Sequence, residues 1–75
     1  MNVEMNRLIG SCLQKLRAEK AMTQIEVADR LGKPQSYVSK IEIGERNLYL
    51  SELFSYANAL GMSACELVSI LEDEM

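Results

Sequence analysis

Apolar residues recur at helical spacing along most of the chain. Between residues 4 and 20 they fall three and four positions apart, at Met5, Leu8, Ile9, Cys12, Leu13 and Leu16. This spacing predicts an amphipathic helix with one buried face. Segments near 24–31, 35–42, 50–60 and 64–72 show similar apolar stripes, and no segment alternates as a half-buried strand would. The pattern therefore predicts an all-α domain of five helices with short connections.

Two helices have sharply defined starts. Thr23 is followed three residues later by Glu26, and Ser63 in the same way by Glu66. In this capping box the hydroxyl and the carboxylate each accept a hydrogen bond from the other residue's backbone N–H. Apolar residues flank both boxes, as a hydrophobic staple requires, so helices are expected to begin directly after Thr23 and Ser63.

Glycines mark the predicted helix ends. Gly32 follows the stripe of Ile25, Ala28 and Leu31, Gly44 follows the third helix, and Gly61 follows the fourth. The fourth stripe comprises Leu50, Leu53, Phe54, Ala57 and Leu60. Helices two and three are thus separated only by the turn Gly32-Lys33-Pro34.

The third helix has an unusual outward face. With about 100° between residues, Val38 and Ile41 point to one side, and the opposite side carries Gln35, Ser36, Ser39 and Lys40. Amides, hydroxyls and one cation without a carboxylate suit hydrogen bonding to base edges in DNA. Taken alone, the same face is also consistent with an ordinary solvated helix surface.

Composition and charge restrict the class of protein. A chain of 75 residues that is 48% hydrophobic and has one proline predicts a single small domain over residues 1–75. The net charge of −3 is unevenly distributed along the chain. Residues 1–46 hold eight bases and six acids, whereas residues 47–75 hold five acids and no base. A basic face on an acidic protein is compatible with this distribution. The terminal acids 72–74 either form part of a functional separation of charge or simply aid solubility.

Several classes of function are not expected. No run of about 18 apolar residues predicts a membrane span, and the first residues do not resemble a secretion signal, so a cytoplasmic protein is expected. The chain has no histidine, and Cys12 and Cys65 both lie on apolar stripes, which predicts buried free thiols and no metal site. No nucleophile stands beside a base, and no glycine-rich phosphate loop occurs. An enzyme, a cofactor and a small-molecule ligand are therefore not expected.

Three spaced motifs together resemble the Cro/phage-repressor (Xre-like) helix-turn-helix family. They are Thr-Gln-x-Glu-apolar-Ala (23–28), Ser-Tyr-Val-Ser-x-Ile-Glu (36–42) and Gly-Glu-Arg-Asn (44–47), and the resemblance extends over residues 13–71. It implies a compact five-helix bundle of lambda-repressor-like type. It also implies that helix three lies in the major groove of double-stranded DNA, usually in a two-fold homodimer on a pseudo-palindromic operator.

The resemblance also implies residue roles. The base-reading positions are Gln35, Ser36, Ser39 and Lys40, and the DNA-backbone positions are Gln24, Tyr37, Arg46 and Asn47. Arg17 and Glu42 match a family ion pair that joins helix one to the end of helix three. Helix geometry agrees, since it places Glu42 at a half-buried position where a carboxylate needs a cation. Family dimers commonly pair through helix five, which points to Leu67, Ile70 and Leu71.

Departures from the family leave the exact function open. Pro34 and Tyr49 stand where small polar caps are common, and Lys40 is the only cation in helix three. A transcriptional regulator is the first interpretation, as a phage-type repressor, a restriction–modification controller or an antitoxin autorepressor. The alternative is a protein-interaction module or antitoxin that keeps the fold, with weak or no independent DNA binding.

Overall fold

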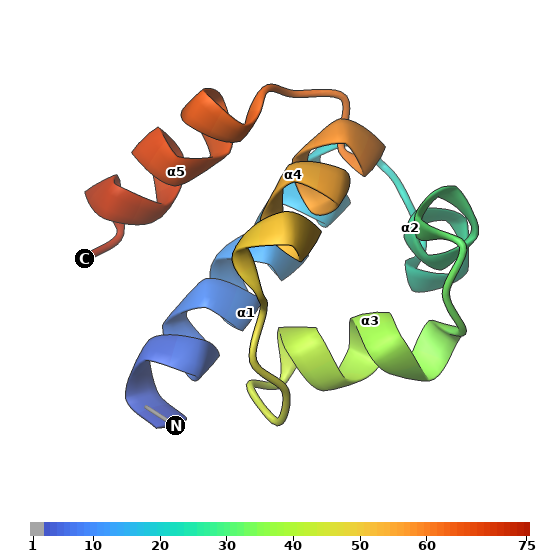
Figure 1. The fold of residues 1–75 in the computed structure, drawn as a ribbon, viewed down its shortest axis with the longest axis horizontal. Coiled ribbons are helices and arrows are strands. Elements are labelled where there is room, and N and C mark those ends of the chain that lie inside the picture. Colours follow the sequence, from blue (N-terminus) through green and yellow to red (C-terminus); the bar gives the residue numbers. More distant parts are fainter. Residues whose placement is uncertain (1–2) are drawn as a thin grey trace.

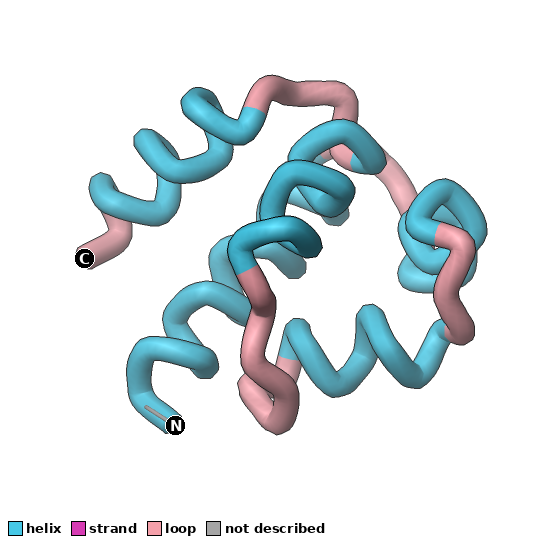
Figure 2. The backbone as a smooth tube through the Cα atoms, in the orientation of Figure 1, coloured by secondary structure: helices cyan, strands magenta, loops and turns pink. Residues whose placement is uncertain are grey.

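Helices dominate the computed structural model, which describes residues 3–75. In chain order they are α1 (Val3–Glu19), α2 (Gln24–Leu31), α3 (Gln35–Glu42), α4 (Leu50–Ala59) and α5 (Ala64–Asp73). The described part of the chain contains no strand, and short loops join the helices (Figure 2). The all-α, five-helix prediction is confirmed. Helix bounds differ from those expected by a residue or so, as is usual at fraying ends.

The two predicted capping boxes both form. The Thr23 hydroxyl accepts from the Glu26 N–H at 3.1 Å, and the Glu26 carboxylate accepts from the Thr23 N–H at 3.1 Å. Ser63 and Glu66 repeat this exchange at 3.0 and 3.2 Å. Each box satisfies two backbone donors that the first turn of a helix would otherwise leave unpaired, so α2 and α5 begin at the predicted residues.

One core joins the five helices. Its largest fully buried side chains come from every helix or its immediate end: Leu13, Val27, Val38, Ile41, Tyr56, Leu60 and Leu67. Helices α1 and α4 lie at the centre, while α2 and α3 lie to one side of them and α5 to the other (Figure 1). The α2–α3 unit is therefore held against α1 and α4 and presents its outer surface to solvent.

Several apolar residues on the predicted stripes are exposed instead. Ile25 is 57% exposed, Leu50 71% and Phe54 59%. Cys65 is also exposed, so the expectation of two buried thiols holds only for Cys12. The reason is geometric, because helical spacing identifies one side of a helix but not how far the neighbouring helices extend to cover it.

Helices α4 and α5 are apolar but strongly bent relative to each other. Within residues 3–75, no single helix is both long and apolar enough to cross a membrane. This pair together has the required length and composition, but its two axes differ by 101°.

Gly10 allows α1 and α3 to approach unusually closely. A Cβ atom at this position would overlap the backbone carbonyl oxygens of Ile41 and Glu42. Backbone atoms cannot turn aside as a flexible side chain can. The absence of a side chain at Gly10 is therefore a condition for the present position of α3.

We expect Gly10→Ala to lower the free energy of unfolding by about 1–3 kcal/mol, the usual cost of overpacking a closely fitted interior. Equilibrium urea denaturation at neutral pH measures this change. Ser11→Ala, at the exposed neighbouring position in the same helix, should alter stability by only about 0.5 kcal/mol. Equal stability of Gly10→Ala and wild type would show that α3 can move away without cost.

Candidate nucleic-acid interface

A three-residue turn sets the angle between α2 and α3. Gly32 adopts the left-handed conformation with φ +67°, which favours glycine, and the Lys33 N–H donates to the Ala28 carbonyl at 3.0 Å. Pro34 is extended and supplies no side-chain cap. The turn thus closes the end of α2 and starts α3 at Gln35, as the sequence predicts.

The outer face of α3 is polar and solvent-accessible. Gln35, Ser36 and Lys40 are exposed and Ser39 is partly buried, so the four expected base-reading side chains share one face. Val38 and Ile41 point inward and are 0% and 1% exposed. Whether the four polar side chains contact DNA stays a prediction, but the helix does present them together.

Behind this face, Glu42 is the centre of a hydrogen-bond network. Arg17 donates to its carboxylate through Nε at 2.7 Å and Nη2 at 3.1 Å, and Gln24 Nε2 donates at 2.8 Å. Glu42 is only 5% exposed, so the expected half-buried position was wrong: the end of α3 is covered by α1 and α2. The Glu42 hydrogen bond raises the pKa of Arg17 above its usual range, which keeps the guanidinium charged.

Gln24 extends this network to the start of α3. Its side-chain Oε1 accepts from Gln35 Nε2 at 3.2 Å, while its Nε2 is bonded to Glu42. Arg17, Glu42, Gln24 and Gln35 thereby form one chain of contacts across α1, α2 and both ends of α3. Removing one partner of a buried charge pair typically costs about 3–5 kcal/mol, so this chain of contacts restricts the position of α3.

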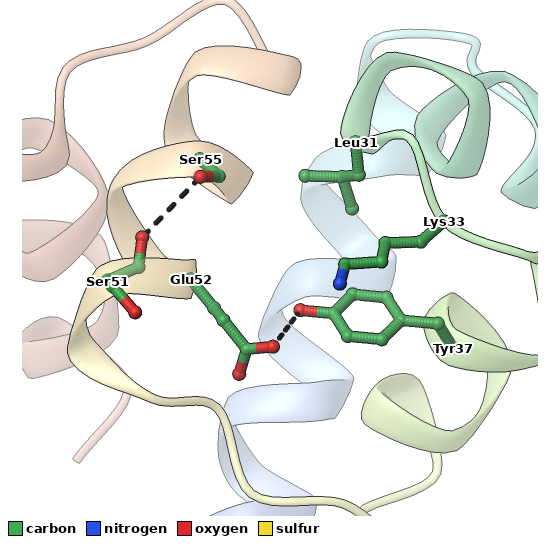
Figure 3. Close-up of a pocket in the computed structure, with 6 residues that line it drawn as sticks. All are labelled: Leu31, Lys33, Tyr37, Ser51, Glu52 and Ser55. Carbon is green, nitrogen blue, oxygen red and sulfur yellow. Dashed lines mark hydrogen bonds between the residues drawn. The ribbon is translucent and has the colours of Figure 1, made fainter.

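A second carboxylate, Glu52 on α4, holds the side chains that follow α3. Arg46 donates to it twice, Nη1 to Oε1 and Nη2 to Oε2, each at 2.9 Å. The Tyr37 hydroxyl donates to Glu52 Oε2 at 2.8 Å (Figure 3), and the Tyr49 N–H donates to Oε1 at 3.0 Å. One carboxylate therefore joins α3, the loop 43–49 and the first turn of α4.

Tyr37 is not placed as a surface contact. Its side chain is 8% exposed, with its hydroxyl on Glu52 and the Arg46 guanidinium 4.5 Å from its ring centroid. The expected direct contact of Tyr37 with the DNA backbone therefore lacks an accessible donor in this structure. Arg46 is partly exposed, and Asn47 is exposed with its Oδ1 accepting from Asn6 Nδ2 at 2.7 Å.

The donors around Glu52 alter two pKa values. Hydrogen bonding from Arg46 outweighs burial and, with the Tyr49 N–H and Tyr37 hydroxyl, lowers the pKa of Glu52 to about 2. Burial and the bond to Glu52 raise the pKa of Tyr37 to about 12. Sequence reasoning missed Glu52, although a glutamate three residues after a helix-start position was a usable signal.

The expected dimer residues on α5 are largely internal. Leu67 is 0% and Leu71 8% exposed, and Ile70 is partly buried against the core, so these three side chains offer little free surface, and their part in a dimer stays a prediction. These residues cover the core of their own chain. The side chains that α4 and α5 leave exposed surround a hollow of about 580 Å³, lined by Leu50, Leu53, Phe54, Ala64, Cys65, Val68, Ser69 and Glu72.

No metal site accompanies these features. Across residues 3–75, no three Cys, Asp or Glu side chains come close enough together to hold a metal ion.

Comparison with known proteins agrees with this geometry. Residues 13–67 match the Helix-turn-helix family, and this span includes the turn and every residue of both carboxylate networks. The chain belongs to the helix-turn-helix family of transcriptional regulators.

Relatives resemble this chain over most of its length. An HTH-type transcriptional regulator of Sinorhizobium fredii is 45% identical over 67 residues, covering 89% of this chain and 87% of the relative. The control protein C.MunI of a Mycoplasma species is 38% identical, covering 87% and 89%. Among solved structures, the restriction-modification controller protein C.Esp1396I superposes with a TM-score of 0.86 at 28% identity, covering 93% and 92%.

We expect acid to weaken the fold through Glu52. Its pKa is lower in the folded chain than the ordinary 4.5, so its contribution is present above about pH 4.5 and is lost as pH falls towards 2. That contribution is at most about 3 kcal/mol, since one pKa unit corresponds to about 1.4 kcal/mol. Urea denaturation between about pH 6 and pH 2 should show that the free energy of unfolding changes less with pH in Glu52→Gln than in wild type. An unchanged dependence in Glu52→Gln, alongside Glu19→Gln as exposed control, would contradict the assignment.

Proposed function

We propose that this protein is a sequence-specific DNA-binding transcriptional regulator that acts as a homodimer, with α3 in the major groove. The observation that carries the proposal is the acid-free outer face of α3. The one carboxylate in the helix, Glu42, is turned inside and bonded to Arg17 and Gln24. Phosphate and base acceptors would therefore meet no opposing negative charge along the helix itself.

The exposed side chains have suitable chemistry for base edges. The Gln35 amide can donate to and accept from adenine in the major groove, and the Lys40 ammonium can donate to the O6 and N7 acceptors of guanine. The hydroxyls of Ser36 and Ser39 can donate or accept. The Gln35 side chain is already held by the hydrogen bond from its Nε2 to Gln24 Oε1, at 3.2 Å. This restraint would lower the conformational entropy lost when Gln35 binds a base.

Contacts to the DNA backbone would come from the flanks of α3. We assign them to Gln24, at the start of α2, and to Arg46 and Asn47 in the loop after α3. Tyr37 would act indirectly, since its ring lies beneath Arg46 at 4.5 Å and its hydroxyl is occupied by Glu52. Backbone contacts of this kind fix register and orientation, whereas base contacts select sequence.

A homodimer would cover the hollow between α4 and α5. Leu50 and Phe54 are 71% and 59% exposed and Val68 is 38% exposed, which is a large apolar surface for a chain this small. Two copies paired here would each contribute one α3, and half-sites about 34 Å apart would allow both helices to reach the major groove. The similar protein C.Esp1396I is known as a tetramer in complex with its natural 35 base-pair operator.

Among regulators, we favour a restriction–modification controller. C.MunI is matched over 89% of its length, and the controller C.AhdI of Aeromonas hydrophila over 94% at 34% identity with a TM-score of 0.77. The immunity repressor of Bacillus phage phi105 is 32% identical but is matched over 42% of its length. Adjacent genes for a DNA methyltransferase and an endonuclease would support this assignment, and adjacent toxin or phage genes would contradict it.

DNA binding should be strong at low salt and should weaken steeply as salt rises, because bound phosphates release counterions. Fluorescence anisotropy with duplexes selected from a random pool measures both the affinity and the operator symmetry. No binding even at low salt would contradict the proposal and favour a protein-interaction module.

Lys40→Ala should lower the preference for the selected operator over random duplex by about 1–3 kcal/mol, the usual value of a good base contact. Competition binding with the two duplexes measures the preference. Lys15→Ala is the matched control, since Lys15 lies on α1 near Glu74, 4.0 Å away. Equal loss of affinity for all sequences would mean that Lys40 contacts phosphate and does not read bases.

Phe54→Glu should convert a dimer to a monomer, because a charge would be buried in the α4–α5 hollow. Sedimentation equilibrium measures the change, and Val68→Glu should have the same effect. The control is Ile25→Glu, which changes another exposed apolar residue on α2 and should leave the dimer intact. A dimer that persists in both hollow variants would place the interface elsewhere.

A further inference from the structure

A second hollow lies beside α3 and is surrounded by cations. It measures about 560 Å³ and is lined by Lys33, Pro34, Ser36, Tyr37, Lys40, Glu45 and Arg46. The three cations come from three different segments: the turn before α3, α3 itself and the loop after it. Lys33 was not among the residues expected to contact DNA, because it lies outside the three family motifs and outside α3.

The Tyr37 ring brings two of these cations together. Lys33 Nζ lies 5.5 Å from the ring centroid and the Arg46 guanidinium carbon 4.5 Å from it. Cation–π contacts at such distances contribute about 0.5–1 kcal/mol each at exposed sites. The ring is itself fixed, because it is buried and its hydroxyl donates to Glu52. Lys33 and Arg46 are thus both held next to one rigid ring.

The charges around this hollow sum to a net positive value, which favours binding of an anion. Arg46 is paired with Glu52 by two hydrogen bonds, so these charges largely offset each other. Lys33 and Lys40 then face a single exposed carboxylate, that of Glu45. The remaining charge is positive and equals in size the charge of one phosphodiester. An open hollow of this volume also suits a length of sugar-phosphate backbone better than a small enclosed ligand.

We propose that this hollow binds a DNA backbone phosphate, with Lys33 as a contact residue and Tyr37 as the platform that positions Lys33 and Arg46. The inference rests on the proposed DNA binding and adds a residue and a site to it. Lys33 lies in the turn that leads into α3, two residues before Gln35, the first residue of the polar face. A cation at the edge of a helix lying in the major groove is close to the DNA backbone, and half or more of all protein–DNA hydrogen bonds go to phosphate and sugar oxygens.

The test compares salt dependences. The dissociation constant of wild type and Lys33→Gln is measured by anisotropy, on an operator selected from a random pool and on a random duplex, from about 50 to about 200 mM salt. Loss of one phosphate contact should reduce the slope of log affinity against log salt by about 0.9, equally on both duplexes. Lys15→Gln, with the same change of charge on α1, should keep the wild-type slope.

The variant Tyr37→Phe distinguishes two roles of Tyr37: positioning Lys33 and Arg46 through its ring, or binding phosphate directly through its hydroxyl. This variant keeps the ring next to Lys33 and Arg46 and removes only the hydroxyl, so both its affinity and its slope should equal those of wild type. A neutral hydroxyl releases no counterion, so a lower affinity at the wild-type slope on both duplexes would mean that the hydroxyl itself binds phosphate, which would overturn the platform role. Circular dichroism checks that the variant is folded.

The remaining outcomes distinguish this inference from the function on which it rests. Wild-type binding with an unchanged slope in Lys33→Gln would overturn the phosphate site and leave the regulator proposal standing. A loss confined to the operator would mean that Lys33 reads bases. Absence of salt-dependent binding by wild type would overturn both proposals.

Discussion

The buried carboxylate of Glu42 is the constraint on which the position of α3 depends. A charge with 5% exposure is stable only if its hydrogen-bond capacity is met, and here Arg17 and Gln24 supply the donors. These donors lie on α1 and α2, so satisfying Glu42 also fixes the end of α3 against both helices. The close approach at Gly10 acts on the same end of α3. Electrostatics and packing together therefore determine which face of α3 reaches solvent.

Glu52 performs a comparable task on the other side of α3. It accepts from Arg46, Tyr37 and the Tyr49 backbone, and so connects the loop to the helices on either side. Together the two glutamates show how a protein with net charge −3 can present a surface suited to DNA. Its acids near α3 are mostly turned inward to hold cations and amides, while the exposed acids of residues 66–74 lie on α5 and after it.

The match to the helix-turn-helix family and the exposed polar face of α3 fall in the same part of the chain. The family match covers residues 13–67, and the exposed polar face lies within it. The apolar hollow is lined by residues of α4 and α5, and α5 lies on the opposite side of α1 and α4 from α2 and α3 (Figure 1), so self-association there would leave the polar face of α3 uncovered. A single cation on α3 would make DNA binding by one copy weak, and pairing two copies on one operator would compensate for this.

The sequence by itself determined the local structure. Helical periodicity predicted five helices, capping boxes at Thr23 and Ser63 predicted the starts of two, and glycines predicted the ends of three, because these signals depend on neighbours within a few residues. Only the tertiary structure decided which parts of each stripe are covered, leaving Phe54 exposed and Leu67 buried. It also decided that Tyr37 supports Arg46 from beneath and that Glu52 joins them, 15 and 6 residues away along the chain. Periodicity shows which residues share a face of a helix, but the packing of the whole chain decides whether that face contacts another helix or solvent.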